Sequence, residues 1–376
     1  MRILFTTVGL SGHFFPLVPL AWGARALGHD VLVAAPDHFA ATVLRAGLPV
    51  ASSGSVPDFV GLVERDWDVS AVEARRRANG KTFAAMAVAS LPGLRELVET
   101  WDPDVVVSER AEFAGRVAAG AGIPFAEVHW GVPALPEYRD AATEALRPAL
   151  SGAALPSPGL VLNPWPAGLR LPHARRHVGF RHVAFNGDAR IPRWLWAPRR
   201  RPRIGLTLGT VLPLLGPDGV LPLLKPVLAR LGAVGAEVVV AVDDAVAADW
   251  PPLPGSVRYA GRVPLAQLLR TCDVAIHHGG QGTSLTALDA GVPQLVLPVF
   301  DDQLDNAEAV VRAGAGIRLA APDLTPEAVA IRCETLLEDG GYGRSARRVA
   351  AEIAAQASPA EVMAGLVTWA AMRPAA

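Results

Sequence analysis

The feature that most constrains this fold is a series of short apolar runs that alternate with amphipathic stretches. Residues 3–8 form the first apolar run, and the apolar spacing over 16–27 predicts a helix that Gly28 ends. A short apolar run between turn residues is typical of a strand buried on both faces of a parallel sheet. The alternation returns at 30–35 and 39–46, so the first half predicts βα units with right-handed crossovers.

A second series of the same kind begins at Arg203, after a Pro- and Trp-rich region at 131–202 that has little periodicity. At about 150 residues per domain, a chain of 376 residues suffices for two or three domains. We therefore expect an α/β protein with two Rossmann-like, doubly wound domains. The expected boundaries are 1–190 for the first domain, 191–202 for an interdomain linker, 203–357 for the second domain and 358–376 for a C-terminal helix. Further strands are expected at 104–108, 124–129, 204–208, 237–242, 274–277 and 294–298, and further helices at 112–121, 221–231, 283–290 and 359–372.

The composition excludes several classes of protein. With 51% hydrophobic and 19% charged residues, the chain as a whole is not intrinsically disordered. A net charge of -1 gives no global attraction to nucleic acid or to anionic lipid. We expect no membrane span, because no stretch of about 20 residues lacks both charges and helix breakers. We also expect no signal peptide, because the chain passes directly into the apolar run at 3–8 without the basic region, apolar region and cleavage site of such a segment. Two cysteines, Cys272 and Cys333, exclude a disulfide scaffold, so the cytoplasm is the expected compartment.

The strongest local motif is HHGGQGT at 277–283, between an expected strand and an expected helix. Glycines let the backbone approach a ligand closely, and a helix start offers free N–H groups and the positive end of its dipole. The motif therefore favours binding of an anion such as a phosphate, with a histidine and Thr283 as added donors. The alternative is a tight turn in which Thr283 caps the helix.

A second polar group follows the expected strand at 294–298. Asp302 and Gln303 place a carboxylate beside an amide, and this pair can bind the vicinal hydroxyls of a sugar. The alternative, weighted equally on spacing alone, is that Asp301 or Asp302 caps a helix.

A third group lies at the ends of two strands in the first half. His13 lies in the turn after the first strand and is a candidate general base, because its reference pKa is about 6.5. Glu109 follows the strand at 104–108, where it can hold the imidazole, and Glu112 is the alternative. The simpler interpretations are a histidine that satisfies a helix terminus and two solvated glutamates at a helix start.

Taken together, these motifs resemble the family 1 glycosyltransferases of the GT-B fold that transfer TDP-sugars to bacterial antibiotics. The resemblance rests on three stretches: FTT…GHFFPLVPLA near the N-terminus, the motif at 277–283, and GVPQLVLP followed by DQ…NA at 291–307. It covers nearly the whole chain and is weakest over 131–202.

The resemblance implies a role for each matching residue. His278, Thr283 and the amides of Gly280, Gln281 and Gly282 would hold the diphosphate, and Asp302 and Gln303 would hold the sugar hydroxyls. Gly209 and Thr210 would line the nucleotide pocket, and Val263 would face the base through its backbone. His13 would be the catalytic base, with Glu109 where the family usually has the shorter Asp. The two domains would face each other across a cleft, and the C-terminal helix would cross back to the first domain.

The activity implied is inverting transfer of a sugar or deoxysugar from a nucleoside diphosphate, expected to be TDP, to a hydroxyl of a small hydrophobic natural-product acceptor. Neither a metal nor a cofactor beyond the sugar nucleotide is expected, and a homodimer is compatible with the family. Two alternatives stay open at this point. One is a UDP-sugar 2-epimerase on the same architecture, and the other is a non-catalytic helper protein that binds a sugar nucleotide.

Overall fold

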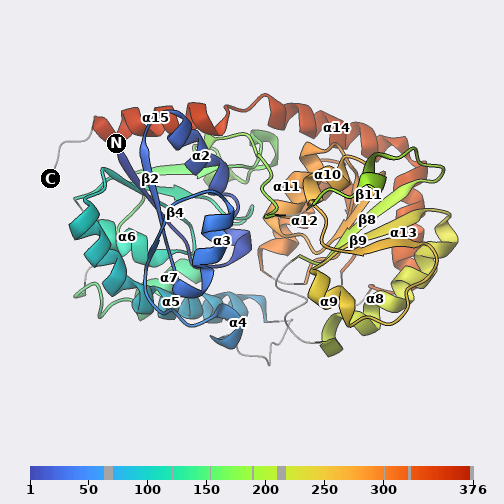
Figure 1. Ribbon diagram of the computed structural model, residues 1–376, viewed down its shortest axis with the longest axis horizontal. Coiled ribbons are helices and arrows are strands. Elements are labelled where there is room, and N and C mark those ends of the chain that lie inside the picture. The colour runs from blue at the N-terminus through green and yellow to red at the C-terminus, as the bar shows by residue number, and fades with distance from the viewer. Residues whose placement is uncertain are drawn as a thin grey trace. The chain divides into compact units, whose positions relative to one another are not determined.

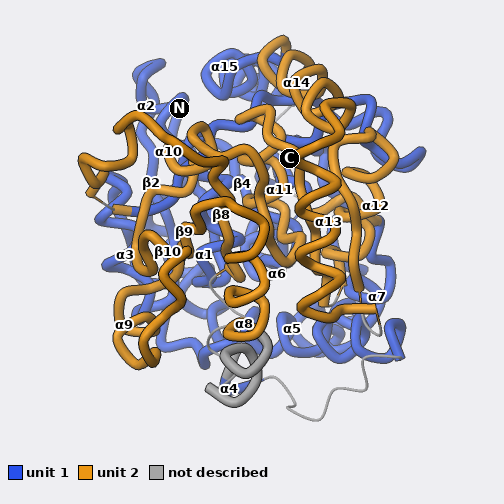
Figure 2. Tube along the Cα trace, turned by 90° about the vertical axis from the view of Figure 1, so that its right-hand side faces the viewer, with its two compact units in different colours: residues 1–130, 134–187, 356–376 blue, residues 131–133, 188–355 orange. Residues whose placement is uncertain are grey.

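The computed structural model divides into two compact units (Figure 1). Unit 1 consists of Met1–Trp130, Ala134–Gly187 and Gln356–Ala376, and unit 2 consists of Gly131–Pro133 and Asp188–Ala355. Figure 2 colours the two units separately. The residues that the structure describes are 1–62, 71–120, 122–152, 154–188, 190–209, 217–299, 301–320 and 323–372.

Unit 1 is built on a parallel sheet with the strand order β3-β2-β1-β4-β5-β6-β7. The central strand β1 pairs with β2 on one side and with β4 on the other. Sequential strands that run outward from a centre in both directions make a doubly wound sheet, as the sequence predicts. The strands are β1 (Arg2–Thr6), β2 (Asp30–Ala35), β3 (Val50–Ser52), β4 (Val105–Glu109), β5 (Phe125–Val128), β6 (Leu160–Asn163) and β7 (Val178–Gly179).

Helices cover both faces of this sheet, so successive strand residues enter two different cores. Ile3 and Phe5 pack in one core, and Leu4 packs in the other. The helices are α1 (Ser11–Phe14), α2 (Val18–Ala26), α3 (Ala40–Arg45), α4 (Phe59–Leu62), α5 (Val72–Trp101), α6 (Phe113–Ala119), α7 (Pro136–Ala145) and α15 (Pro359–Ala371). Short 3-10 turns lie at Asp37–Phe39, Ala167–Leu169 and Pro172–Ala174.

The C-terminal helix α15 belongs to unit 1 and packs against α2 (Figure 1). Ser358 and Glu361 form a capping box that begins the helix. Met363 and Leu366 are buried in the same core as Ile3. The apolar face of this helix is therefore part of a core that the first residues of the chain begin.

Unit 2 repeats the plan with a parallel sheet in the order β10-β9-β8-β11-β12-β13. Alternate residues again enter two cores: Val238 and Val240 pack in one, and Val239 packs in the other. The strands are β8 (Arg203–Thr207), β9 (Glu237–Ala241), β10 (Val257–Gly261), β11 (Val274–His277), β12 (Gln294–Val296) and β13 (Gly316–Arg318). The helices are α8 (Pro217–Leu231), α9 (Asp244–Ala248), α10 (Leu265–Leu269), α11 (Gln281–Asp289), α12 (Asp302–Arg312), α13 (Pro326–Glu338) and α14 (Gly340–Ala354), with 3-10 turns at Arg193–Trp196 and Gly232–Val234.

The structure confirms two parallel-sheet α/β domains and differs from the sequence-based expectations in detail. Residues 191–202, expected to be a linker, fall within unit 2. Leu195 is buried there, and the guanidinium of Arg203 stacks on the Trp194 ring. The region 131–202 also holds a helix and two strands, although its Pro and Trp content masks their periodicity. No described helix is long and apolar enough to cross a membrane.

Candidate active site

His13 lies in the short helix α1, which follows the carboxyl end of β1. The imidazole is buried among aromatic rings of unit 1: its centroid is 4.9 Å from the ring of Trp130 and 5.4 Å from that of Phe83. Only 9% of the His13 side chain is exposed. A histidine enclosed in this way is held in one orientation, because its ring cannot turn without displacing its neighbours.

Glu109 is the last residue of β4, which pairs with β1, so both side chains start from the same edge of the sheet. Glu109 Oε2 lies 3.0 Å from His13 Nδ1 and accepts a hydrogen bond of 2.8 Å from the Ala111 amide. The Nδ1–H is not aligned with this oxygen, so the two groups are in close contact without a formed hydrogen bond. The longer glutamate therefore still reaches the imidazole.

Glu112, the alternative partner, has a different environment. It caps α6: Oε1 accepts from the Ala114 amide at 3.0 Å, and Oε2 accepts from the Gly115 amide at 2.9 Å. The Thr6 hydroxyl also donates to Oε2. Burial raises the pKa of Glu112, although the bond from Thr6 opposes this effect. Because these contacts occupy the carboxyl group, we assign Glu112 to the fold and not to the imidazole.

In unit 2, the motif at 277–283 joins β11 to α11, as expected. His277 is fully buried: its Nδ1 accepts from the Gly279 amide at 3.0 Å, and its Nε2 lies 2.7 Å from Gln294 Oε1. Nδ1 is therefore the acceptor, and Nε2–H donates to Gln294. Burial lowers the pKa of His277 to about 4. This histidine shapes the turn and stays neutral.

His278, the next residue, lies between two glycines. A Cβ on Gly209 would collide with the imidazole, and one on Gly280 would lie 2.5 Å from its Nε2. Burial, with a smaller contribution from His277, lowers the pKa of His278 to about 3. His278 can therefore offer a phosphate a neutral N–H donor and not a positive charge. Thr210, predicted beside Gly209, lies outside the described residues.

The helix α11 begins at Gln281 with Gly280 as its N-cap, so Thr283 lies inside the first turn and is not the cap. The first bond of the helix joins the Ser284 amide to the Gly280 carbonyl. The amide groups of a helix before its first internal bond have no acceptor within the helix and point outward along its axis. The predicted diphosphate donors at 280–283, with Gly280 at the N-cap and the others in the first turn, therefore occupy the part of the helix that is suited to an anion.

Asp302 and Gln303 open α12 and are 4% and 5% exposed. Asp302 Oδ2 accepts from Asn306 Nδ2 at 2.6 Å, and Gln303 Oε1 accepts from the Val299 amide at 3.0 Å. Asp301, which precedes them, has φ of 52° and makes no side-chain capping bond. A non-glycine residue in that region is strained, and such strain is common where a fold positions functional groups.

Asn306 joins the predicted diphosphate and sugar groups. Its Nδ2 donates to the Gly279 carbonyl at 2.9 Å as well as to Asp302, and its Oδ1 accepts from the Val132 amide at 2.9 Å. The neighbouring Gly131 amide donates to Gln281 Oε1 at 2.8 Å. The segment Gly131–Pro133 thus packs in unit 2 against both parts of the site.

Val263 lies between β10 and α10 and is 7% exposed. Its side chain packs in a core of unit 2 with Leu268 and Leu269. With the side chain held inward, contact with a ligand would come from the backbone, as the family resemblance implies.

Sequence reasoning missed several residues of these surroundings. Trp130 and Phe83 come from segments with no local motif, and Asn306 was part of a motif without an assigned role. These residues contact groups far away in the sequence, so no local pattern identifies their role. Within the described residues, no group of three or more His, Cys, Asp or Glu side chains is arranged to hold a metal ion.

Comparison with known proteins places both halves of the chain in one family. Residues 22–209 match the family described as "Erythromycin biosynthesis protein CIII-like, N-terminal domain", and residues 225–369 match its C-terminal domain. The chain is 38% identical to the L-demethylnoviosyl transferase of Streptomyces niveus, over 97% of each protein.

Two solved structures, both complexed with thymidine diphosphate, share the fold. Spinosyn rhamnosyltransferase SpnG has a TM-score of 0.85 and 33% identity, covering 98% of this chain and 100% of its own. Glycosyltransferase SsfS6 of Streptomyces sp. SF2575 has a TM-score of 0.83 and 31% identity, covering 98% and 99%. These relatives are transferases, and they give no support to an epimerase or a helper protein. The chain therefore belongs to the erythromycin CIII-like family of natural-product glycosyltransferases, which have the GT-B fold.

Proposed function

We propose that this protein is an inverting, metal-independent glycosyltransferase that moves a deoxysugar from TDP to a hydroxyl of a small hydrophobic acceptor. The single observation that carries the proposal is the approach of Glu109 Oε2 to within 3.0 Å of His13 Nδ1. The two structural neighbours bound to thymidine diphosphate support TDP as the nucleotide. The aromatic rings around His13 favour an apolar acceptor in unit 1.

The proposed chemistry assigns a role to each group. Glu109 favours the tautomer of His13 with the proton on Nδ1, so that Nε2 takes the proton of the acceptor hydroxyl. The acceptor oxygen then bonds to the anomeric carbon as the bond from that carbon to the diphosphate breaks. The electron pair leaves with the diphosphate, and Glu109 stabilises the imidazolium that forms.

The donors at the start of α11 stabilise the departing diphosphate. Fixed backbone N–H groups and the neutral imidazole of His278 are oriented before the reaction begins, so little reorganisation is needed as charge develops. This arrangement supplies the stabilisation that a metal ion provides in other transferases.

We also place the enzyme in the cytoplasm, in keeping with the free thiols of Cys272 and Cys333.

The test combines transfer with nucleotide binding. His13→Ala and Glu109→Gln should each lower the rate of transfer from a TDP-sugar to a confirmed acceptor by about a hundredfold or more, because proton removal loses its base or its orienting carboxylate. Both variants should keep the rise in melting temperature that TDP causes, since a ligand stabilises the folded state to which it binds.

Two residues of unit 1, the partly exposed His29 and the exposed Glu96, provide matched controls. His29 directly precedes β2, at the opposite end of the sheet strands from His13, and Glu96 lies near the end of α5. His29→Ala and Glu96→Gln remove the same chemical groups and should transfer at the wild-type rate. Wild-type turnover by His13→Ala would remove His13 from the mechanism. A larger thermal shift with UDP than with TDP would reject the assignment of the nucleotide.

A further inference from the structure

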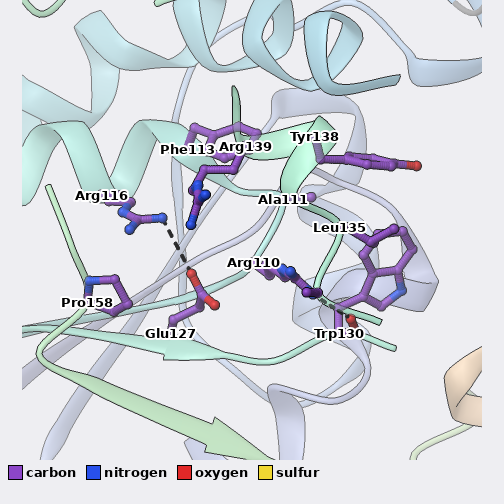
Figure 3. Close-up of a pocket in the computed structure, with 11 residues that line it drawn as sticks. Arg110, Ala111, Phe113, Arg116, Glu127, Trp130, Leu135, Tyr138, Arg139 and Pro158 are labelled. Atoms are coloured by element: carbon purple, nitrogen blue, oxygen red, sulfur yellow. Dashed lines mark hydrogen bonds and ion pairs between the residues drawn. The ribbon is translucent and has the colours of Figure 1, made fainter. Parts of the chain in front are cut away.

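Unit 1 contains a pocket of about 130 Å³ that the proposed chemistry leaves without a role (Figure 3). Its lining comes from the residues after β4, from α6, from β5 and the segment that follows it, and from the start of α7, with Pro158 before β6. The lining includes three guanidinium groups, one carboxylate and three aromatic side chains: Arg110, Arg116, Arg139, Glu127, Phe113, Trp130 and Tyr138.

The charges of this lining are unequal. Glu127 Oε2 lies 3.4 Å from Arg116 Nη1, and both side chains are at most 10% exposed. Arg110 Nη1 donates to the Trp130 carbonyl at 3.4 Å, and Figure 3 shows this contact and that between Arg116 and Glu127. Arg139 is 62% exposed and lies 3.3 Å from Asp140. Among the lining residues, Glu127 is the one carboxylate beside three guanidinium groups, while Asp140 and Glu109 act on Arg139 and Arg110 from outside the lining.

Burial adds to this imbalance. Removal from water lowers the pKa of both Arg110 and Arg116, and Glu127 opposes the effect in each case, with a smaller opposing effect of Glu109 at Arg110. Buried cations gain most from a partner that replaces lost hydration, and a guanidinium binds a carboxylate through two parallel N–H···O bonds. The pocket therefore suits a planar anion.

The pocket shares two residues with the surroundings of His13. The ring of Trp130 lines the pocket and lies 4.9 Å from the His13 ring. Ala111 also lines the pocket, and its amide holds Glu109 Oε2. A ligand seated against Trp130 would thus lie beside the groups that we propose to carry proton transfer.

The backbone at the pocket is also held in an unusual conformation. Leu135, which lines the pocket just before α7, has φ of 44° and is 1% exposed. A bulky residue rarely adopts a positive φ, and a fold keeps such strain mainly where it shapes a site.

From these observations we propose that the pocket binds the carboxylate of an aromatic acid, and that this group is a recognition element of the acceptor. The guanidiniums of Arg110 and Arg139 take the carboxylate, and Trp130 and Tyr138 pack against the attached ring. The link to the acceptor rests on the proposed function, whereas the binding of an aromatic carboxylate to the pocket does not.

The test measures binding without any sugar nucleotide, by calorimetry or by NMR titration. The probes are para-hydroxybenzoate and its methyl ester, which differ in charge and share the ring and hydroxyl. The wild-type protein should bind the acid about tenfold more tightly than the ester, which is the size expected of a charge-assisted pair. Arg110→Gln and Arg139→Gln should each weaken binding of the acid about tenfold and leave binding of the ester unchanged.

Arg95 on α5 is an exposed arginine of the same unit outside the pocket, so Arg95→Gln should leave both affinities at their wild-type values. Arg139 is itself largely exposed, so its variant keeps the test valid even if loss of the buried Arg110 prevents folding. Equal affinity for acid and ester would overturn the proposal, as would a preference for the acid that survives both substitutions or no binding of either probe in the millimolar range. Failure of sugar transfer, with the preference for the acid intact, would count against the proposed function alone.

Discussion

His277 and His278 are adjacent in the chain and differ in their burial, their hydrogen-bond partners and the residues that surround their rings. His277 is fully buried with both ring nitrogens engaged, whereas the Nδ1 of His278 has no hydrogen-bond partner among the described residues and its ring lies between Gly209 and Gly280. The direction of a side chain at a strand end decides which neighbour enters the core. At the residue scale, the position of the His278 imidazole therefore depends on two glycines whose missing Cβ atoms leave space for it.

Gly209→Ala should weaken TDP binding about tenfold. The residue has φ of 74°, and an added Cβ would displace the imidazole of His278 from its position. Isothermal titration with TDP measures the effect. Gly235→Ala is the matched control, because Gly235 has φ of 75° and open space around its Cβ position, so it carries the backbone strain alone. Equal affinities of the two variants for TDP would show that the contact with His278 has no part in binding.

At the scale of elements, glycines decide how closely helices pack. The helix α5 was not expected from the sequence, and its interior contains Gly80, Pro92 and Gly93, which local rules treat as helix breakers. A Cβ on Gly80 would lie 2.5 Å from the Tyr138 carbonyl, and one on Gly93 would lie 2.8 Å from that of Ser53. Tertiary packing thus requires the residues that locally disfavour the helix.

Alanine substitutions at one glycine in α2 and one in α15 should change the stability of the protein in opposite directions. Gly23→Ala should destabilise unit 1 by about 1–3 kcal/mol, because its Cβ would lie 2.9 Å from the Ala360 amide and push α15 away. Gly365→Ala, in α15, should stabilise the protein by about 0.5–1 kcal/mol, since its Cβ meets open space and alanine favours the helix. Urea unfolding measures both changes, and a stabilising effect of Gly23→Ala would contradict the observed packing.

At the scale of the whole molecule, buried imidazoles make stability depend on pH. Burial lowers the pKa of His177 and His277 to about 4 and that of His129 well below 6.5. The unfolded chain, with a histidine pKa of about 6.5, binds protons first as the pH falls. Buried Glu112 and Glu127 act in the opposite direction, because their raised pKa lets the folded state take protons first. The buried imidazoles outnumber these two carboxyl groups.

We therefore expect the urea midpoint of unfolding to fall as the pH is lowered from about 6.5 toward 4, with each buried imidazole contributing up to about 1.4 kcal/mol per pH unit. His277→Gln should make this dependence shallower, whatever its effect on stability at neutral pH. His38→Gln removes an exposed histidine and should leave the slope as it is. Parallel slopes for wild type and His277→Gln would refute the assignment of the effect to this buried ring.

Much of the architecture was predictable because it depends on local patterns. The apolar runs at 3–8 and 274–277 predicted buried parallel strands, and their ends located the turns that carry His13 and the motif at 277–283. In a parallel sheet the carboxyl ends of strands share one edge, so polar residues just after each strand are natural site candidates. The C-terminal helix was also evident from its apolar periodicity.

By itself, then, the sequence determined the two parallel α/β sheets and the motifs at their strand ends, because strand and helix periodicity is a property of neighbouring residues. Only the tertiary structure decided that Glu109 meets His13 while Glu112 caps a helix, that Asn306 joins Gly279 to Asp302, and that three arginines surround one pocket. The physical reason is that burial, side-chain direction and charge balance at each of these places arise from segments far apart in the chain, which come together only when the cores pack.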